Sequence, residues 1–441
     1  MPKPSARPFG SLRPVVGKMI VFALAPAISL MAPLVALPAI SAVHGSDGWS
    51  SIAIGQSLGT AISVVVELGW GITGPISAAR QSQSHVSRLF RRSLWERSVV
   101  YAVLIPVIIG VVAVLKPASP VAAVLAALSM AMNGLAASWL YVALSKPLHM
   151  VFLDTLPRAG SSLLGALAIT TAKAPLEVLP AIQIVGAALA MLAPLLFLPS
   201  PISRAEIKNP WAAIAHQFWA SQGAALLTRL STTAYVALPT VILAAVAPPQ
   251  AVASYAAVDR LARAGLSGLG SAGLAFQGWI PGATGTALIV RLRTALLFNI
   301  VLAVFSAAGF WMVAPYLLRL LFLDAVSVDA LTINSFAGVV ALVVLSRCTG
   351  IQCLAVLGRT WQVAISTAIG FFVSIPLIVI TGQRWGASGV ALTVMTVELL
   401  VLVIQLIHLL NVFRARPAPF RSSPITGYDA TQTELARSSD R

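Results

Sequence analysis

The stretch YAAVDRLARAGLSGLGSAGLAFQGWIP at residues 255–281 is an apolar run long enough to cross a bilayer, yet it contains two arginines, Arg260 and Arg263, one helical turn apart. A charged side chain in the hydrocarbon region costs at least about 2.5–3.5 kcal/mol, so it usually faces water, a partner group or a ligand. This stretch therefore predicts a membrane-spanning helix, and its two cations indicate that the protein handles an anion.

The composition of the whole chain is that of an integral membrane protein. Of its 441 residues, 58% are hydrophobic and only 10% are charged, and the mean hydropathy is +0.90, whereas a soluble domain carries about 25% charged residues. The net charge of +16 does not indicate nucleic-acid binding, because the basic residues are not gathered on one polar domain and no nucleic-acid motif is present. The apolar run 19–43 is too long for a signal peptide, so we expect an uncleaved first helix.

Breaks at polar, proline and charged clusters divide the chain into twelve candidate spans, each able to cover the hydrocarbon core as a helix. The sequence therefore predicts an all-α, polytopic integral membrane protein with about twelve transmembrane helices. The expected spans are 19–43, 51–79, 98–115, 121–144, 151–172, 178–198, 218–247, 253–280, 294–317, 330–357, 361–381 and 386–411.

The long polar break at 199–217, near the midpoint of the chain, predicts two six-helix lobes. We expect the N-terminal lobe to cover residues 19–205 and the C-terminal lobe residues 206–412. Residues 1–18 are expected to form a cytoplasmic N-terminal segment. Residues 413–441, which are rich in proline and polar side chains, are expected to form a disordered cytoplasmic tail.

The distribution of lysine and arginine predicts the orientation in the membrane. With twelve spans, 21 of these residues fall on the side that holds both termini, four fall on the other side and four lie inside spans. Because positively charged loops stay in the cytoplasm, both termini are expected to be cytoplasmic. The basic segment RLFRRSLWER at 88–97 is expected to be a cytoplasmic loop that touches anionic lipid headgroups.

Two interpretations of Arg260 and Arg263 remain open. Asp259 is spaced i,i+4 with Arg263 and can neutralise it on the same helix face, and Glu398 is a second carboxylate at similar depth. Alternatively, both arginines line a cavity that binds an anion. In the same way, Asp154 and Arg158 of DTLPR are expected to form an interfacial ion pair, with a role in substrate binding as the alternative.

No pattern indicates an enzyme, a cofactor or a metal. The sequence contains no G-x-x-x-x-G-K-[ST] nucleotide-binding motif and no Ser/His/Asp or paired-carboxylate constellation. The five histidines are scattered. Cys348 and Cys353, five residues apart, face different directions on an α-helix, so neither a disulfide nor a metal site is expected.

The chain contains, in this order, the segments GQSLGTAISVVVELGWGITGPISAAR (55–80), ASYAAVDRLARA (253–264) and WGASGVALTVMTVELLVL (385–402). They resemble, respectively, the second helix, the eighth helix and the start of the last helix of the polysaccharide and O-antigen flippases in the multidrug/oligosaccharidyl-lipid/polysaccharide exporter superfamily. Together with the twelve spans, the resemblance covers about residues 15–411.

The resemblance implies a two-lobed transporter that moves a polyprenyl-pyrophosphate-linked oligosaccharide across the bacterial cytoplasmic (inner) membrane by alternating access, for cell-surface polysaccharide biosynthesis. Arg260 or Arg263 matches the basic position of the eighth-helix pattern and is expected to bind the pyrophosphate; Arg229 is a further candidate by composition alone. The expected partners are the lipid bilayer, the polyprenyl-linked glycan and a polysaccharide polymerase or glycosyltransferases.

Three alternatives remain. A cation-coupled multidrug or small-molecule exporter of the same fold commonly uses acidic residues in its first lobe, where Glu67 is the only acid well inside a span; Glu67 and Glu398 are therefore possible ion-coupling residues. A major-facilitator transporter would show Gly-x-x-x-Asp-Arg after the second span, and this chain does not. An integral membrane polysaccharide-assembly enzyme would carry long acidic outer loops, whereas the longest here is about 318–329.

Overall fold

The chain is an all-helical, multi-pass membrane protein in its computed structural model. The structure describes residues 12–78, 82–198, 237–280 and 285–414. Within these ranges seven helices are long and apolar enough to cross a membrane. The expected all-α, polytopic fold is therefore confirmed, while the expected lobe boundary at 205/206 lies outside the described residues.

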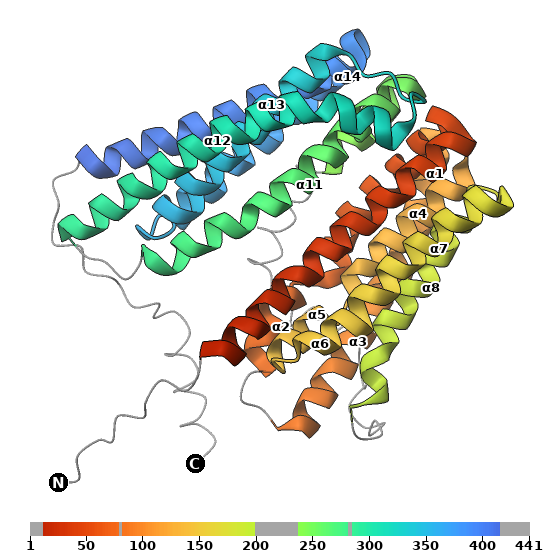
Figure 1. Cartoon of the computed structure of the whole chain (residues 1–441), viewed down its shortest axis with the longest axis horizontal. Helices are drawn as coiled ribbons and strands as arrows, with labels where there is room; N and C mark the ends of the chain where they lie inside the picture. Colours follow the sequence, from red (N-terminus) through yellow and green to blue (C-terminus); the bar gives the residue numbers. More distant parts are fainter. Residues whose placement is uncertain (1–11, 79–81, 199–236, 281–284, 415–441) are drawn as a thin grey trace.

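The first part of the chain forms a group of helices packed around α1 (Figure 1). Helix α1 contacts α4 and α7, and α7 packs along α8. The elements of this N-terminal group are α1 (Leu12–Glu67), α2 (Trp70–Ala78), α3 (Gln83–Leu115), α4 (Pro120–Ala131), the 3₁₀-helix η1 (Met132–Leu135), α5 (Ser138–Ala143), α6 (Pro147–Met150), the π-helix η2 (Val151–Thr155), α7 (Leu156–Ala172), α8 (Val178–Leu192) and the 3₁₀-helix η3 (Ala193–Leu196).

The second part of the chain forms a C-terminal group in which α13 packs against both α12 and α14. A short apolar helix, Ala237–Val246, precedes it along the chain. The further elements of this group are α11 (Pro249–Trp279), α12 (Gly285–Phe322), α13 (Ala330–Arg347), the π-helix η6 (Cys348–Leu354) and α14 (Thr360–Arg414).

Two glycines allow α1 and α14 each to contain two successive helices. Gly45 has φ 62° and Gly386 has φ 56°, in the left-handed region that glycine adopts without steric cost. Gly45 lies between the expected spans 19–43 and 51–79, and Gly386 lies at the start of the expected span 386–411. Helices α1 and α14 therefore each consist of two successive helices that meet at a glycine.

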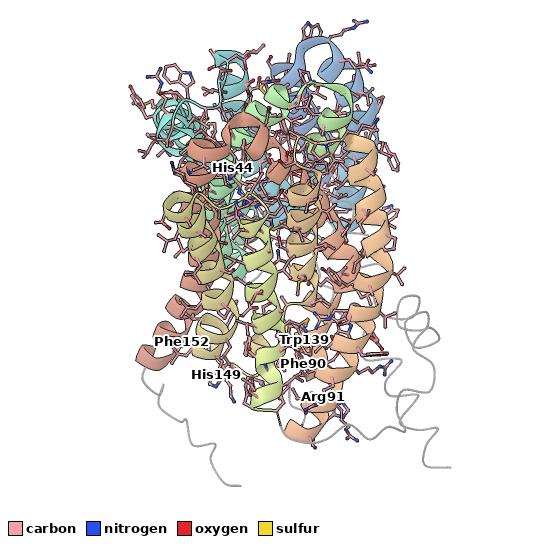
Figure 2. All side chains as sticks on the ribbon, turned by 90° about the vertical axis from the view of Figure 1, so that its right-hand side faces the viewer. His44, Phe90, Arg91, Trp139, His149 and Phe152 are labelled. Atoms are coloured by element: carbon pink, nitrogen blue, oxygen red, sulfur yellow. The ribbon has the colours of Figure 1, made fainter. Side chains whose placement is uncertain are left out.

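The two helix groups lie close together at one end and separate toward the other, as Figure 1 shows. Figure 2 shows His44 near one end of the N-terminal group and Arg91 and His149 near the opposite end; we call these the His44 end and the Arg91 end. Close to the His44 end, the indole Nε1 of Trp49 donates a hydrogen bond to the carbonyl of Ala253 at 3.1 Å. The Trp49 ring also lies 5.3 Å from the Phe322 ring. Trp49 of α1 thus joins the two groups.

The basic segment 88–97 is helical, so the expectation of a loop there was wrong. Helix α3 already begins at Gln83, where the Ser82 hydroxyl accepts a hydrogen bond from the backbone N–H of His85. Arg92 pairs with Glu96 one turn later at 2.8 Å. These local interactions extend the third span toward the Arg91 end, because a helix tolerates charges where they can pair or reach the membrane surface.

Arg97 stabilises a break in the fourth span. Helix α4 ends at Ala131, and the carbonyls of Gly134 and Ala136 each accept a hydrogen bond from Arg97 Nη1 at 3.0 Å. Arg97 is fully buried, and its Nε donates to the carbonyl of Ser93 at 3.1 Å. Backbone carbonyls freed at a helix break need new donors in a buried site, and this guanidinium supplies them.

The two cysteines also differ from expectation. A π-helix repeats its hydrogen bonds at i,i+5, so η6 places Cys348 and Cys353 on the same face. Both thiols are free and buried. The prediction that they face different directions was wrong because it assumed a regular α-helix.

Replacing Arg97 by alanine is expected to destabilise the protein, because two buried carbonyls lose their donors at about 1–3 kcal/mol each. The measurement is the melting temperature of the purified, detergent-solubilised protein. Arg293→Ala, at an exposed position of α12, is the control and should change stability by less than about 0.5 kcal/mol. Equal melting temperatures for the two variants would contradict the role given to Arg97.

Replacing Trp49 by phenylalanine keeps a ring but removes the hydrogen bond to Ala253, so the His44 end should open more often, by about fivefold for a bond worth about 1 kcal/mol. The readout is the rate at which a membrane-impermeant maleimide, added only on the side of the membrane that the His44 end faces, labels a cysteine placed at Ala256, a buried position of α11, in a Cys348→Ser/Cys353→Ser background. Trp361→Phe, at an exposed tryptophan of α14, should leave the rate unchanged. An unchanged rate in Trp49→Phe as well would show that this bond does not hold the end closed.

Candidate functional site

Two adjacent cavities lie between the helix groups. The larger, of about 430 Å³, is lined by residues of α1, α4, η1, η2, α7 and α8 on one side and of α11 on the other. The smaller, of about 80 Å³, is lined by α1, α11 and the short helix Ala237–Val246. Thr60, Arg260 and Arg263 line both. The structure therefore places the two arginines expected from the sequence at an internal cavity.

Arg263 is both paired and part of the cavity wall. Its Nε donates to Asp259 Oδ2 at 2.6 Å across one helical turn, which confirms the pairing predicted from their spacing. The Arg263 side chain remains 32% exposed, against 16% for Asp259. The two interpretations of Arg263 are therefore compatible, because the ion pair leaves part of the guanidinium facing the cavity.

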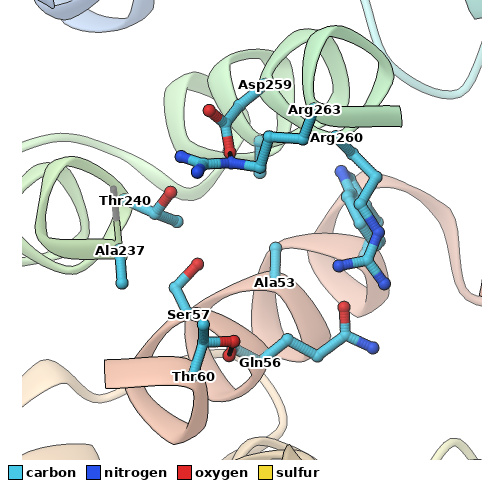
Figure 3. Close-up of a pocket in the computed structure, with 11 residues that line it drawn as sticks. Ala53, Gln56, Ser57, Thr60, Ala237, Thr240, Asp259, Arg260 and Arg263 are labelled. Carbon is cyan, nitrogen blue, oxygen red and sulfur yellow. Dashed lines mark hydrogen bonds and ion pairs between the residues drawn. The ribbon is translucent and has the colours of Figure 1, made fainter. Parts of the chain in front are cut away.

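Arg260 points away from that ion pair. Figure 3 shows its side chain extending toward Gln56 of α1, while Arg263 turns toward Asp259. Within the described ranges, the Arg260 guanidinium has no hydrogen-bond partner and no contact ion pair, and the buried Oε1 of Gln56 has no donor. A partly buried guanidinium in this state keeps all five of its N–H donors available for a ligand.

A third arginine reaches the larger cavity from the N-terminal group. Arg158 of α7 pairs with Asp154 of the preceding π-helix η2, with Nε to Oδ1 at 3.2 Å, which confirms the predicted pair. Its Nη1 donates to Asn133 Oδ1 at 2.5 Å. All three residues line the larger cavity, so the pair belongs to the cavity wall, and its position at the membrane interface stays a prediction.

The remainder of this N-terminal wall is uncharged and combines polar with apolar side chains. Ser129, Ser161, Ser162 and Gln183 line the cavity beside Arg158, and Gln183 Nε2 donates to Ser162 Oγ at 3.1 Å. Sequence analysis did not select Gln183 or Asn133. Each is an amide side chain inside an otherwise apolar span, and this pattern could have identified them. Burying an unpaired amide among apolar side chains costs free energy, so such a residue is expected to face a cavity or a hydrogen-bond partner.

The other candidate residues are not brought to these cavities. Glu67 lies near Arg97, and Glu398 near Arg347, in each case close enough for their charges to interact. Neither glutamate is among the described residues that line the two cavities. Arg229 lies outside the described residues. The ion-coupling role of Glu67 and Glu398 stays a prediction.

The described residues of the site include no metal-binding arrangement. No cluster of three or more histidine, cysteine, aspartate or glutamate side chains occurs within the part of the chain that the structure describes. The polar groups of the cavity walls are guanidinium groups, the paired carboxylates of Asp154 and Asp259, amides and hydroxyls, which bind through charge and hydrogen bonds.

No protein-family model and no curated protein sequence matches the chain, but several solved structures do. Lipid II flippase MurJ in an inward closed conformation matches with a TM-score of 0.63 and 12% identity, over 88% of this chain and 87% of that chain. A MOP superfamily transporter from Pyrococcus furiosus matches with a TM-score of 0.50 and 12% identity, over 91% of this chain and 95% of that chain. An outward-facing multidrug resistance MATE family transporter of the MOP superfamily matches with a TM-score of 0.49 and 14% identity, over 90% of this chain and 94% of that chain.

These matches establish the fold and leave the substrate open, because the identities are low. MOP is the multidrug/oligosaccharidyl-lipid/polysaccharide exporter superfamily, so the resemblance seen in the sequence holds at the level of the superfamily fold. The titles of the two structures with TM-scores of 0.50 or above name a flippase and a transporter. The chain has the fold of MOP-superfamily membrane transporters.

Proposed function

We propose that the chain is a flippase that moves a polyprenyl-pyrophosphate-linked oligosaccharide across the bacterial cytoplasmic membrane by alternating access, for cell-surface polysaccharide biosynthesis. The observation that carries the proposal is the position of Arg260 and Arg263 in a cavity between the two helix groups. A guanidinium presents a planar fork of donors that fits phosphate oxygens, and the attraction is stronger between apolar helices than in bulk water because the dielectric constant is lower there.

The charges of the cavity wall favour an anionic substrate over a cationic drug. The described wall of the larger cavity carries three arginines and one carboxylate, that of Asp154, which is already paired with Arg158. The carboxylate at the smaller cavity, that of Asp259, is paired with Arg263. A cation would therefore meet a positive wall. The fold alone does not decide between these substrates, because the solved structures that share it include both a lipid flippase and a multidrug transporter.

The arrangement of the helix groups supports alternating access. The groups are joined by Trp49 near the His44 end and separate toward the Arg91 end (Figure 1). The basic segment 88–97 lies toward the Arg91 end, and the bias of positive charge along the chain predicts that this end faces the cytoplasm. In this proposal the structure represents the state that receives substrate from the cytoplasmic side.

The size of the larger cavity fits a headgroup. Ligand cavities of about 300–1,000 Å³ enclose a molecule of drug size, and this one measures about 430 Å³. The pyrophosphate and the first sugar would occupy it, with hydroxyls and amides of the N-terminal wall facing the sugar, while the polyprenyl chain stays in the bilayer. The glycosyltransferases that build the glycan and a polymerase that uses it are the partners that this activity requires.

Replacing both Arg260 and Arg263 by alanine is expected to abolish translocation, because removal of two charge-assisted donors weakens binding by about 1.5–3 kcal/mol each. The assay reconstitutes the full chain in proteoliposomes and measures transfer of a polyprenyl-pyrophosphate-linked sugar to the opposite leaflet. The variant should remain folded and membrane-inserted.

Arg293→Ala provides the matched control, because Arg293 is an exposed arginine of α12 that does not line either cavity. It should translocate at the wild-type rate. Wild-type transport by the Arg260/Arg263 double variant would eliminate the anion site, and cation-dependent drug efflux that requires Glu67 or Glu398 would support an exporter instead.

A further inference from the structure

Arg158 is held in a fixed position on the wall that faces Arg260 and Arg263. Two of its three guanidinium nitrogens are occupied, Nε by Asp154 and Nη1 by Asn133. Asn133 belongs to the 3₁₀-helix η1, and Asp154 to the π-helix η2, so two irregular segments hold one side chain. π-Helical turns frequently occur at functional sites. Arg158 is therefore oriented before any ligand enters.

The third guanidinium nitrogen of Arg158 has no partner. Nη2 is buried and makes no hydrogen bond to any described residue. Close by on the same wall, the buried Oε1 of Gln183 also lacks a donor. A buried N–H without an acceptor costs about 1–3 kcal/mol, more for a charged group, and native proteins rarely leave one. An acceptor supplied by a ligand would satisfy it.

We infer that Arg158 is a third pyrophosphate-binding residue, contributed by the N-terminal helix group, so that one anion is bound from both groups at once. This inference rests on the proposed function and adds a residue and a geometry to it. Arg158 keeps its contacts with Asp154 and Asn133 and binds a phosphate oxygen through Nη2, while Arg260 binds from α11. The two phosphates, each with a negative charge, then bridge cations of opposite groups.

A bridging anion has a conformational consequence. A ligand shifts an equilibrium between two states only by its difference in affinity for them. An anion held by Arg158 and Arg260 together favours the state in which α7 and α11 approach each other, whereas an anion held by α11 alone does not distinguish the states. Arg158 thus couples substrate binding to movement of one helix group relative to the other.

The competing explanation is that Arg158 only pairs with Asp154 to fix η2 against α7. The two explanations differ in what Asp154→Asn does. If the pair is structural, this variant and Arg158→Gln should weaken binding alike. If Arg158 binds the anion, Asp154→Asn keeps an oxygen for Arg158, removes a negative charge from the cavity and should maintain or increase affinity.

The experiment measures the affinity of the purified full-length protein for farnesyl diphosphate, a short polyprenyl diphosphate. Arg158→Gln should raise the dissociation constant by roughly tenfold or more, which corresponds to the loss of one charge-assisted hydrogen bond. Arg158→Lys, which keeps the charge but lacks the fork, should fall between Arg158→Gln and the wild type. Asp154→Asn should bind at least as tightly as the wild type. Arg293→Gln, outside the cavities, should match the wild type.

Each outcome has a definite meaning. Weaker binding in Arg158→Gln together with retained binding in Asp154→Asn supports the assignment. Wild-type affinity in Arg158→Gln, or an equal loss in both variants, overturns it and leaves the proposed function standing. If Arg158→Gln does not fold, the comparison of Arg158→Lys with Asp154→Asn decides in the same way. Failure of the wild-type protein itself to bind farnesyl diphosphate contradicts the proposed function.

Discussion

Burying a guanidinium group among membrane-spanning helices costs free energy, and this cost governs how the helices of the protein are arranged. Each such group must be hydrogen-bonded, paired or given a ligand. Arg97 uses backbone carbonyls at a helix break, Arg263 uses a carboxylate one turn away, and Arg158 uses a carboxylate and an amide. Arg260, without a partner among the described residues, faces the cavity between the helix groups.

These solutions explain the arrangement of the helices around the cavity. The break after α4 exists because Arg97 satisfies the carbonyls that it frees, and the same break provides Asn133 for the cavity wall. Trp49 joins α1 to α11 on the His44 side of the arginines, so the charged part of α11 lies where the groups begin to separate. The packing of the helix groups and the positions of the charged side chains between them therefore depend on each other.

Hydropathy and residue spacing were sufficient for the fold class and for two ion pairs. The spans follow from apolar runs, and Asp259–Arg263 and Asp154–Arg158 follow from i,i+4 spacing. The start of α3 was missed because charges end an apolar run but do not end a helix. The alignment of Cys348 with Cys353 was missed because a π-turn leaves no hydropathy signal.

The composition of the cavity could not be predicted, because it depends on how distant helices face each other. Arg158 and Arg260 are 102 positions apart in the sequence, and helix rotation decides whether either points inward or toward lipid. Spacing along one helix carries no information on that rotation. The resemblance to polysaccharide flippases identified the basic position on α11, but no motif marked its counterpart on α7.

The central claim is that the cavity selects an anionic headgroup, and a direct comparison of two lipids tests it. The affinities of the wild-type protein for farnesyl diphosphate and for a farnesyl chain with a trimethylammonium headgroup would be measured at low and at high salt. The account predicts tighter binding of the diphosphate, with an affinity that falls as salt rises because ions screen the attraction. Equal affinity for both lipids, or preference for the cationic one, would contradict it.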